Sequence, residues 1–333
     1  MKAIWETAKE ITLQRIIMSY QLRSAALLIP NQLDGLCVIV TGSTSGIGYH
    51  TARELAFAGA HVIMACRRVD AAKGIAERWK EDADDRKTLH VEVMELDLLS
   101  LSSVKQFAAK WDQRGKPLHI LINNAGILLL GEPRQFSEDG LEKHIQVNHI
   151  ATSLLTLLLL PSMLRANSAR IVNVNSVGHL WGAVEPKSWK IGAEEERKFS
   201  SMTSYGSSKL AQLMFLKALC TKLISMAETS VLCVAVHPGI VKSNLLSDGR
   251  MRGFWMLDPS EGARNVLFCS VRADVQHNTT ENFAYYSQCK PGRMSSLAED
   301  PKECLRAWDE TLCILGFSPN GYLSEIIASR SFS

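Results

Sequence analysis

A glycine-rich turn between an apolar run and a helical pattern constrains the fold more than any other feature of this sequence. Residues 38–41 read VIVT, Gly42, Gly46 and Gly48 follow, and residues 46–58 have helical spacing. In that context glycines allow a tight turn and a close approach of a pyrophosphate, and the free N–H groups at the helix start face the phosphate. The stretch predicts a dinucleotide-binding unit; the alternative is a plain glycine turn.

Short apolar runs alternate with helical patterns from residue 36 onward. Several runs lack polar alternation, which is typical of strands buried on both faces of a parallel sheet. The alternation predicts the α/β class: a single-domain doubly wound (Rossmann) parallel sheet flanked by helices. The expected strands are 36–41, 61–66, 89–96, 118–123, 169–175 and 230–236, and the expected helices are 46–58, 70–83, 101–113, 138–166, 203–227 and 259–272.

The two ends of the chain differ from this pattern. Residues 1–33 read as an amphipathic N-terminal extension, and residues 1–29 suit peripheral contact with a membrane or packing on the protein itself, with a cleaved targeting peptide as the alternative. The apolar run 154–164 is too short to span a bilayer and contains Pro161, so we expect a buried helix. The Rossmann domain is expected at 34–318, with a substrate-side insertion at 184–202, a C-terminal helix at 301–316 and a tail at 319–333.

Net charge and cysteine spacing limit the kinds of ligand and partner expected for this protein. The net charge of +3, from 37 basic and 34 acidic residues, is too balanced to favour nucleic acid. The eight cysteines form no CxxC pair and have no metal-site spacing, so we expect reduced core cysteines and no metal. This cysteine usage indicates an intracellular protein, in the cytoplasm or at the surface of an organelle membrane.

Two arginines indicate which dinucleotide binds. At the end of the second expected strand, where a fold that prefers NAD(H) carries an acid, Cys66 is followed by Arg67 and Arg68. Guanidinium groups suit a 2′-phosphate, so NADP(H) is predicted over NAD(H), unless both arginines only solvate a loop. Asp97, ending the third strand, is a candidate acceptor for the adenine amino group.

Three further motifs occur later in the chain and join the glycine turn in a fixed order. TGSTSGIG (41–48), NNAG (123–126), Ser176 after the fifth strand and YGSSK (205–209) occur in this order. Together they resemble the short-chain dehydrogenase/reductase superfamily over about residues 34–245. The resemblance implies a reacting centre of Ser176, Tyr205 and Lys209, with Asn148 linked through water to Lys209.

The chemistry of these residue types agrees with that role. Tyr205 and Lys209 are four residues apart, so they share one face of a helix. An adjacent ammonium is expected to lower the pKa of the phenol, which could then exchange a proton with a substrate oxygen. Ser176 would hold that oxygen by a hydrogen bond as negative charge develops.

The resemblance also implies a set of cofactor contacts around the strand ends. Ser243 stands where the family often has threonine, and its hydroxyl is retained. The set is Gly42, Ser43, Ser45, Gly46, Ile47, Gly48, Arg67, Arg68, Asp97, Asn124, Ala125, Gly126, Tyr205, Lys209, Pro238, Gly239, Val241 and Ser243.

Residues 285–317 are similar to the tail of retinol dehydrogenase-like members of that superfamily. This implies a small lipophilic substrate, such as a retinoid, a steroid or a fatty aldehyde. The alternative is a nucleotide-binding regulatory or scaffold protein with little turnover; the oligomeric state stays open. The expected substrate contacts are Ser176, Leu128, His179, Trp181 and Trp255, with Leu129, Leu180, Met202, Leu246 and Phe254 as further walls.

Overall fold

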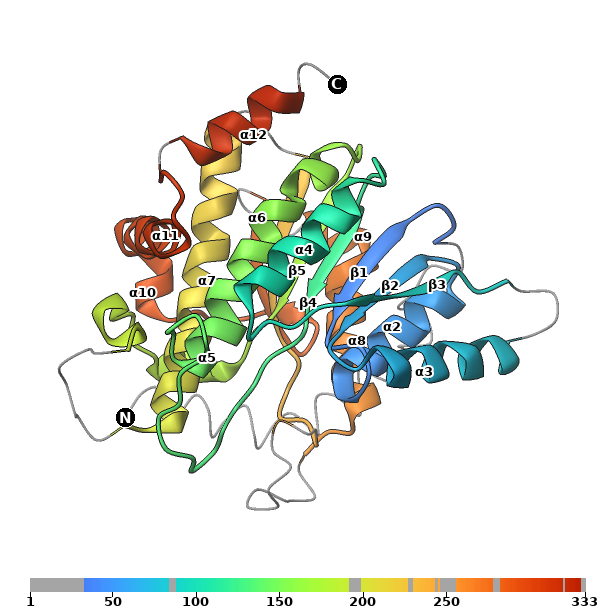
Figure 1. The fold of residues 1–333 in the computed structure, drawn as a ribbon, viewed down its shortest axis with the longest axis horizontal. Coiled ribbons are helices and arrows are strands. Elements are labelled where there is room, and N and C mark those ends of the chain that lie inside the picture. Colours follow the sequence, from blue (N-terminus) through green and yellow to red (C-terminus); the bar gives the residue numbers. More distant parts are fainter. Residues whose placement is uncertain are drawn as a thin grey trace.

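A mostly parallel sheet runs through the centre of the protein, with helices on both faces (Figure 1). The structure, a computed structural model, describes residues 33–83, 88–191, 199–226, 230–242, 245, 256–277, 282–319 and 321–330. Within these residues the strand order is β3-β2-β1-β4-β5-β6-β7-β8, and only β8 runs antiparallel to its neighbour. The doubly wound α/β fold predicted from the sequence is confirmed.

The six strands expected from the sequence are all present. Two more follow them, and the sequence patterns above did not identify either. The strands are β1 (Cys37–Thr41), β2 (His61–Cys66), β3 (Val91–Glu95), β4 (Ile120–Asn123), β5 (Ala169–Val174), β6 (Val231–His237), β7 (Phe283–Ser287) and β8 (Lys290–Pro291).

The helices also follow the expected order, with one wrong boundary. The helix expected from residue 138 begins at Lys143, because bridges of Phe136 with Glu142 and of Leu141 with Lys190 hold the preceding segment extended. The helices are α2 (Gly46–Phe57), α3 (Val69–Glu81), α4 (Leu101–Asp112), α5 (Lys143–Ile145), the π-turn η2 (Gln146–Ile150), α6 (Ala151–Leu164), the 3-10 turns η3 (Val177–Trp181) and η4 (Pro186–Trp189), α7 (Ser201–Ser225), α8 (Pro259–Val271), α9 (Ala273–His277), α10 (Ser296–Glu299), α11 (Pro301–Leu315) and α12 (Tyr322–Arg330).

Alternate residues of the strands point into two separate hydrophobic cores, one on each face of the sheet. Ile39 faces the core covered by α4, α6 and α7, whereas Val38 and Val40 face the core covered by α2, α3 and α8 (Figure 1). On the outside of α7, the ring of Trp308 from α11 stacks on Phe215 with centroids 4.9 Å apart. Burial on both faces explains why the strands are apolar throughout.

The most apolar helix belongs to this core. Among the described residues one helix, Lys143–Leu164, is long and apolar enough to cross a membrane, but 89% of its most apolar window is buried inside the protein. The prediction of a buried helix at 154–164 is therefore confirmed. The N-terminal segment 1–29, predicted to contact a membrane or the protein body, lies outside the described residues.

Backbone geometry explains the three glycines after β1. Gly42 and Gly46 have φ angles of +66° and +59°, which L side chains rarely adopt. A Cβ on Gly48 would lie 2.4 Å from both Gly42 O and Asn124 Nδ2. Glycine at these positions lets α2 begin directly against the ends of β1 and β4.

Gly48→Ala is expected to destabilise the domain by about 1–3 kcal/mol, because the new methyl group meets backbone that cannot move easily. Gly74→Ala is the matched control: it also lies in a helix, and its Cβ would meet only the flexible end of Arg78, 3.8 Å away. That change should stabilise the domain by up to about 1 kcal/mol. Urea unfolding measures both, and equal effects would contradict the close-approach argument.

Candidate active site

The ends of β1 and β4 are joined by side-chain hydrogen bonds. Thr41 Oγ1 accepts from the backbone N–H groups of Asn124 and Ala125, each at 3.0 Å. Asn124 Nδ2 donates in return to Thr41 O at 2.9 Å. These contacts bring the predicted cofactor residues Asn124 and Ala125 beside Gly42, as expected for one dinucleotide site. Thr41 itself was not singled out, although it is the first letter of the TGSTSGIG motif.

The first turn of α2 fits an anionic group. Its N-cap, Ser45, makes no side-chain capping bond, and the turn contains no acidic residue. Ser43 Oγ is buried without a hydrogen-bond partner within the described structure. Uncapped N–H groups and the helix dipole favour a phosphate here, so Gly46, Ile47 and Gly48 lie where a pyrophosphate would fit.

The adenosine-side residues lie next to this turn. Arg68 Nη2 donates to Thr44 Oγ1 at 3.4 Å, while Arg67 is exposed. Asp97 is half-buried, and its Oδ1 accepts from Leu99 N at 2.9 Å, so part of its carboxylate serves the local turn. The contact with Thr44 holds one guanidinium beside the glycine turn.

Three of the four predicted catalytic side chains meet at the end of β5. The side chains of Tyr205 and Ser176 lie on either side of one point, since a Cβ on Gly178 would be 3.3 Å from Tyr205 Cε1 and 3.4 Å from Ser176 Oγ. Ser176 Oγ accepts from Gly178 N at 3.1 Å. Lys209 Nζ donates to Val174 O at 2.9 Å and lies 5.9 Å from the centroid of the Tyr205 ring. Helix α7 thus presents both residues to the strand end that precedes Ser176.

The electrostatics differ from the sequence-based expectation. Burial raises the pKa of Tyr205 above its ordinary value, and the nearby Ser176 hydroxyl offsets only part of this. Burial also lowers the pKa of Lys209 to about 8. The pKa of the phenol is therefore raised in this structure, with loss of solvent as the largest cause. The lowering of this pKa by the ammonium stays a prediction. At neutral pH Tyr205 is a protonated phenol.

Asn148 lies in the π-turn η2, a type of helix distortion that is frequent at functional sites. Its Oδ1 accepts from Ile127 N at 2.8 Å, and its Nδ2 donates to Ile127 O and Ser208 Oγ, each at 3.0 Å. A Cβ on Gly126 would lie 3.1 Å from Asn148 Oδ1 and 3.4 Å from Lys209 Nζ. Asn148 therefore holds the chain after β4 close to Lys209; the water-linked relay between them stays a prediction.

The segment after β6 carries the remaining cofactor residues. Pro238 O accepts from Asn265 Nδ2 at 3.0 Å, and Gly239 has a φ angle of +91°. Val241 forms a bridge with Leu257. The predicted contact through Ser243 lies outside the described residues.

The predicted substrate residues separate into different environments. Trp181 is half-buried, and its indole approaches to 2.8 Å of the position of a Cβ on Gly206, the residue after Tyr205. His179 is fully buried, 5.0 Å from the Tyr285 ring, and its Nδ1 is 2.6 Å from Ser176 O. Burial lowers the pKa of His179 to about 4. Its position supports the Ser176 turn, and its contact with substrate stays a prediction.

The other wall residues are partly exposed or not described. Leu128, Leu129, Leu180 and Met202 are half-buried. Leu246, Phe254 and Trp255 lie outside the described residues.

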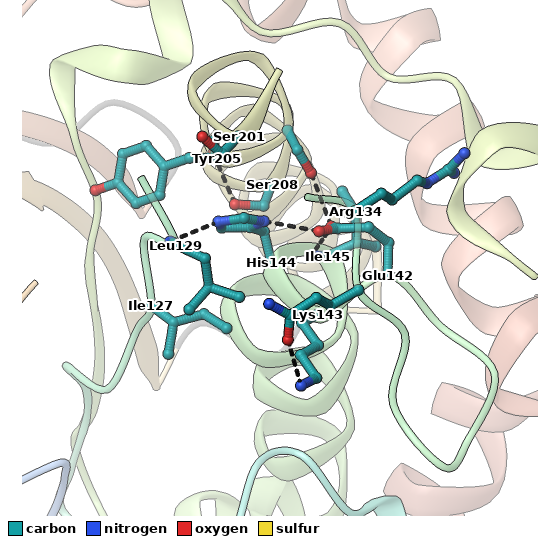
Figure 2. Close-up of polar contacts among 12 residues, drawn as sticks. Ile127, Leu129, Arg134, Glu142, Lys143, His144, Ile145, Ser201, Tyr205 and Ser208 are labelled. Carbon is teal, nitrogen blue, oxygen red and sulfur yellow. Dashed lines mark hydrogen bonds and ion pairs between the residues drawn. The ribbon is translucent and has the colours of Figure 1, made fainter. Parts of the chain in front are cut away.

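Sequence reasoning missed several polar side chains that support the site. Asn175 donates to Lys209 O at 2.8 Å and accepts from Ser176 N at 2.8 Å, so it connects two catalytic residues. Its place directly before Ser176 was the available signal. Figure 2 shows a second group around Glu142 and His144, whose only sequence signal is the spacing of two polar residues before an apolar helix.

Comparisons with known proteins agree with this geometry. Residues 36–185 match the family model described as short chain dehydrogenase. The FEY dehydrogenase/reductase of Arabidopsis thaliana, named as an SDR family member, is 42% identical over 324 residues, which cover 92% of this chain and 85% of that protein. Retinol dehydrogenase 12 of Mus musculus is 35% identical over 292 residues, covering 86% and 88%.

A solved structure supports the same assignment. An uncharacterised protein of Mycobacterium paratuberculosis has a TM-score of 0.70 and 30% identity, and the match covers 88% of this chain and 97% of that one. Fold and site define an oxidoreductase built on a Rossmann sheet. The chain belongs to the short-chain dehydrogenase/reductase family and is retinol dehydrogenase-like within it.

Lys209→Met is expected to make the protein more stable at pH 7. The folded pKa of Lys209, about 8 against an ordinary 10.5, means that the unfolded chain binds a proton more tightly. The cost of charging the buried amine, on the order of 3 kcal/mol, is present below pH 8 and disappears as the pH rises toward 10.5.

Chemical unfolding between pH 6 and 11 tests this. Buried cysteines titrate in the same range in both proteins, so the difference isolates Lys209: the stability advantage of Lys209→Met over the wild type should shrink across the upper half of that range. Lys105→Met, which changes an exposed lysine on α4, is the control and should shift stability by less than about 0.5 kcal/mol. A Lys209→Met protein that is less stable at pH 7 would contradict the burial argument.

Proposed function

We propose that the protein is an NADP(H)-dependent oxidoreductase that transfers hydride between C4 of the nicotinamide and a lipophilic carbonyl or alcohol. The observation that carries the proposal is the buried Tyr205 side chain, which lies beside Ser176 and has Lys209 Nζ 5.9 Å from the centroid of its ring. Each of these groups has a distinct use in carbonyl chemistry.

The nicotinamide, when bound, supplies or accepts the hydride. During reduction Tyr205 donates its phenolic proton to the substrate oxygen as negative charge develops there. Ser176 donates a hydrogen bond to the same oxygen. Burial raises the pKa of Tyr205, which favours the protonated phenol that donates in this step. Lys209 would hold the nicotinamide ribose hydroxyls through its Nζ.

The proposed preference for NADP(H) rests on Arg67 and Arg68. Both guanidinium groups are exposed at the end of β2, and Arg68 is held beside the glycine turn through Thr44. A 2′-phosphate in this place would receive charge-assisted hydrogen bonds, whereas a bare ribose would leave two cations without an anionic partner from the cofactor.

The proposed substrate class rests on two observations. Relatives at 35% identity are named retinol dehydrogenases. Beside Tyr205 the chain offers the half-buried side chain of Trp181, and the segment after NNAG offers that of Leu128. Apolar walls with a few oriented polar groups suit an apolar ligand with one reacting oxygen, such as a retinoid, steroid or fatty aldehyde.

Tyr205→Phe is expected to lower kcat for NADPH-dependent reduction of all-trans-retinal by about 10²–10⁴-fold, because the proton donor is lost while the ring is kept. Loss of NADPH absorbance measures turnover, and fluorescence titration measures NADPH binding, which should change little. Tight NADPH binding by the wild type without oxidation across a panel of lipophilic aldehydes and ketones would favour the scaffold alternative.

Arg67→Ala and Arg68→Ala should each raise the KM for NADPH by about 10–100-fold, the effect of losing a hydrogen bond to a charged group. The KM for NADH should stay nearly constant, since NADH has no 2′-phosphate. Arg53→Ala, an arginine of α2, serves as the control and should affect neither cofactor. Equal losses for NADPH and NADH would refute the phosphate assignment.

A further inference from the structure

The segment after the NNAG motif is held at every second residue by side chains from neighbouring helices. Ile127 is held through both backbone groups by Asn148. Leu129 N donates to His144 Nε2 at 2.9 Å, and Gly131 N donates to Ser201 Oγ at 3.0 Å. We call residues 127–131 the wall segment, since it contains the predicted wall residues Leu128 and Leu129.

The middle contact depends on one tautomer of His144. The Leu129 N–H can only donate, so Nε2 must accept, which places the ring proton on Nδ1. Nδ1 then donates to Glu142 Oε1 at 2.7 Å (Figure 2). The side chains of His144 and Glu142 are only 1% and 3% exposed, so water does not compete for these bonds. Glu142 therefore determines which nitrogen faces the wall segment.

The carboxylate of Glu142 is itself well satisfied. Its Oε2 accepts from Ile145 N at 3.0 Å and from the Ser204 hydroxyl at 2.7 Å. Hydrogen bonds from His144, Ser204 and Ile145 thus compensate the buried carboxylate for the loss of water. The backbone of Glu142 is anchored as well, because its N–H donates to Trp189 O at 2.8 Å.

The Ser204 contact extends this network to the reacting centre. Ser204 directly precedes Tyr205 in the first turns of α7, so its hydroxyl fixes the helix start relative to α5. Glu142 thus has one oxygen that serves the wall segment through His144 and another that serves the helix carrying Tyr205 and Lys209.

We propose that Glu142 and His144 are positioning residues that hold the wall segment and the start of α7 at a fixed distance, and so shape the apolar side of the substrate site. This inference rests on the proposed function, because the wall segment and the start of α7 shape the same site at which that reaction would take place. Neither residue is placed in contact with substrate or cofactor; they act through Leu129 and Ser204.

Two substitutions of His144 separate its two hydrogen bonds. In His144→Asn the amide reaches only the Nδ1 position, so it can donate to Glu142 but cannot accept from Leu129 N. In His144→Gln the amide reaches the Nε2 position and can accept from Leu129 N. Amide hydrogen exchange of peptides covering 127–131, measured on full-length protein with saturating NADPH, should speed up about tenfold in His144→Asn and much less in His144→Gln.

Kinetics with NADPH and all-trans-retinal separate the two ends of the network. His144→Asn should raise the KM for retinal about tenfold with a smaller change in kcat, because the wall is loosened and the proton donor is not. Ser204→Ala should lower kcat by about three- to tenfold with a smaller change in KM, because the start of α7 is loosened beside Tyr205. The affinity for NADPH should stay the same in both variants.

The inference is overturned if His144→Asn leaves exchange at 127–131 unchanged, or if His144→Gln speeds it as much as His144→Asn. Exchange that rises evenly across the whole domain would show a merely structural role and would also overturn it. Failure of the proposed function looks different: the wild type would not oxidise NADPH with any substrate, while the exchange pattern of the variants would still support or reject the network.

Discussion

The buried amine of Lys209 is the interaction on which the reacting centre depends. Its Nζ donates to Val174 O at the end of β5, which pins α7 to the sheet and brings Tyr205, one turn earlier, over Ser176. Burying this amine is unfavourable, as its pKa of about 8 indicates. The surrounding apolar core of α7 and the sheet stabilises the arrangement, and Asn175 completes it by binding Lys209 O and Ser176 N. The fold therefore tolerates an unfavourable buried amine at Lys209, where the proposed reaction uses a cation.

Close backbone approach is the second organising feature. A Cβ on Gly48 would collide with Gly42 O at the end of β1, and a Cβ on Gly126 would press on Asn148 and Lys209, so the absence of a Cβ leaves room at the two strand ends of the proposed dinucleotide site. On the substrate side, Gly206 lets the Trp181 indole lie against α7. The proposed cofactor end consists mainly of backbone at the glycine turn. The proposed substrate end consists of side chains on the wall segment, which hydrogen bonds from neighbouring helices keep in place. Families built on one fold can therefore vary the side chains of the substrate end without disturbing the backbone of the cofactor end.

Periodicity and motif order predicted much of this organisation. The buried strands, the glycine turn and the Tyr205–Lys209 spacing are local features, and the rule that ligands bind at strand ends placed them together. The start of the helix at Lys143 was missed because isolated bridges to distant residues hold the preceding segment extended. β8 was missed because a two-residue strand at the sheet edge has no periodicity of its own. β7 has five residues and was missed because most of it was considered only as part of the C-terminal stretch 285–317. The π-turn around Asn148 has no local sequence signature.

By itself the sequence determined the α/β class, the strand order along the chain and the residue types available for proton transfer, since these follow from side-chain periodicity and chemical identity. Only the tertiary structure decided their protonation states and partners. Burial raises the pKa of Tyr205 and lowers that of Lys209, and burial depends on neighbours in space. Likewise, the bond from Ser204 to Glu142 joins residues 62 positions apart, and that from Leu129 to His144 joins residues 15 apart. Such contacts depend on how three separate segments pack, which no local pattern records.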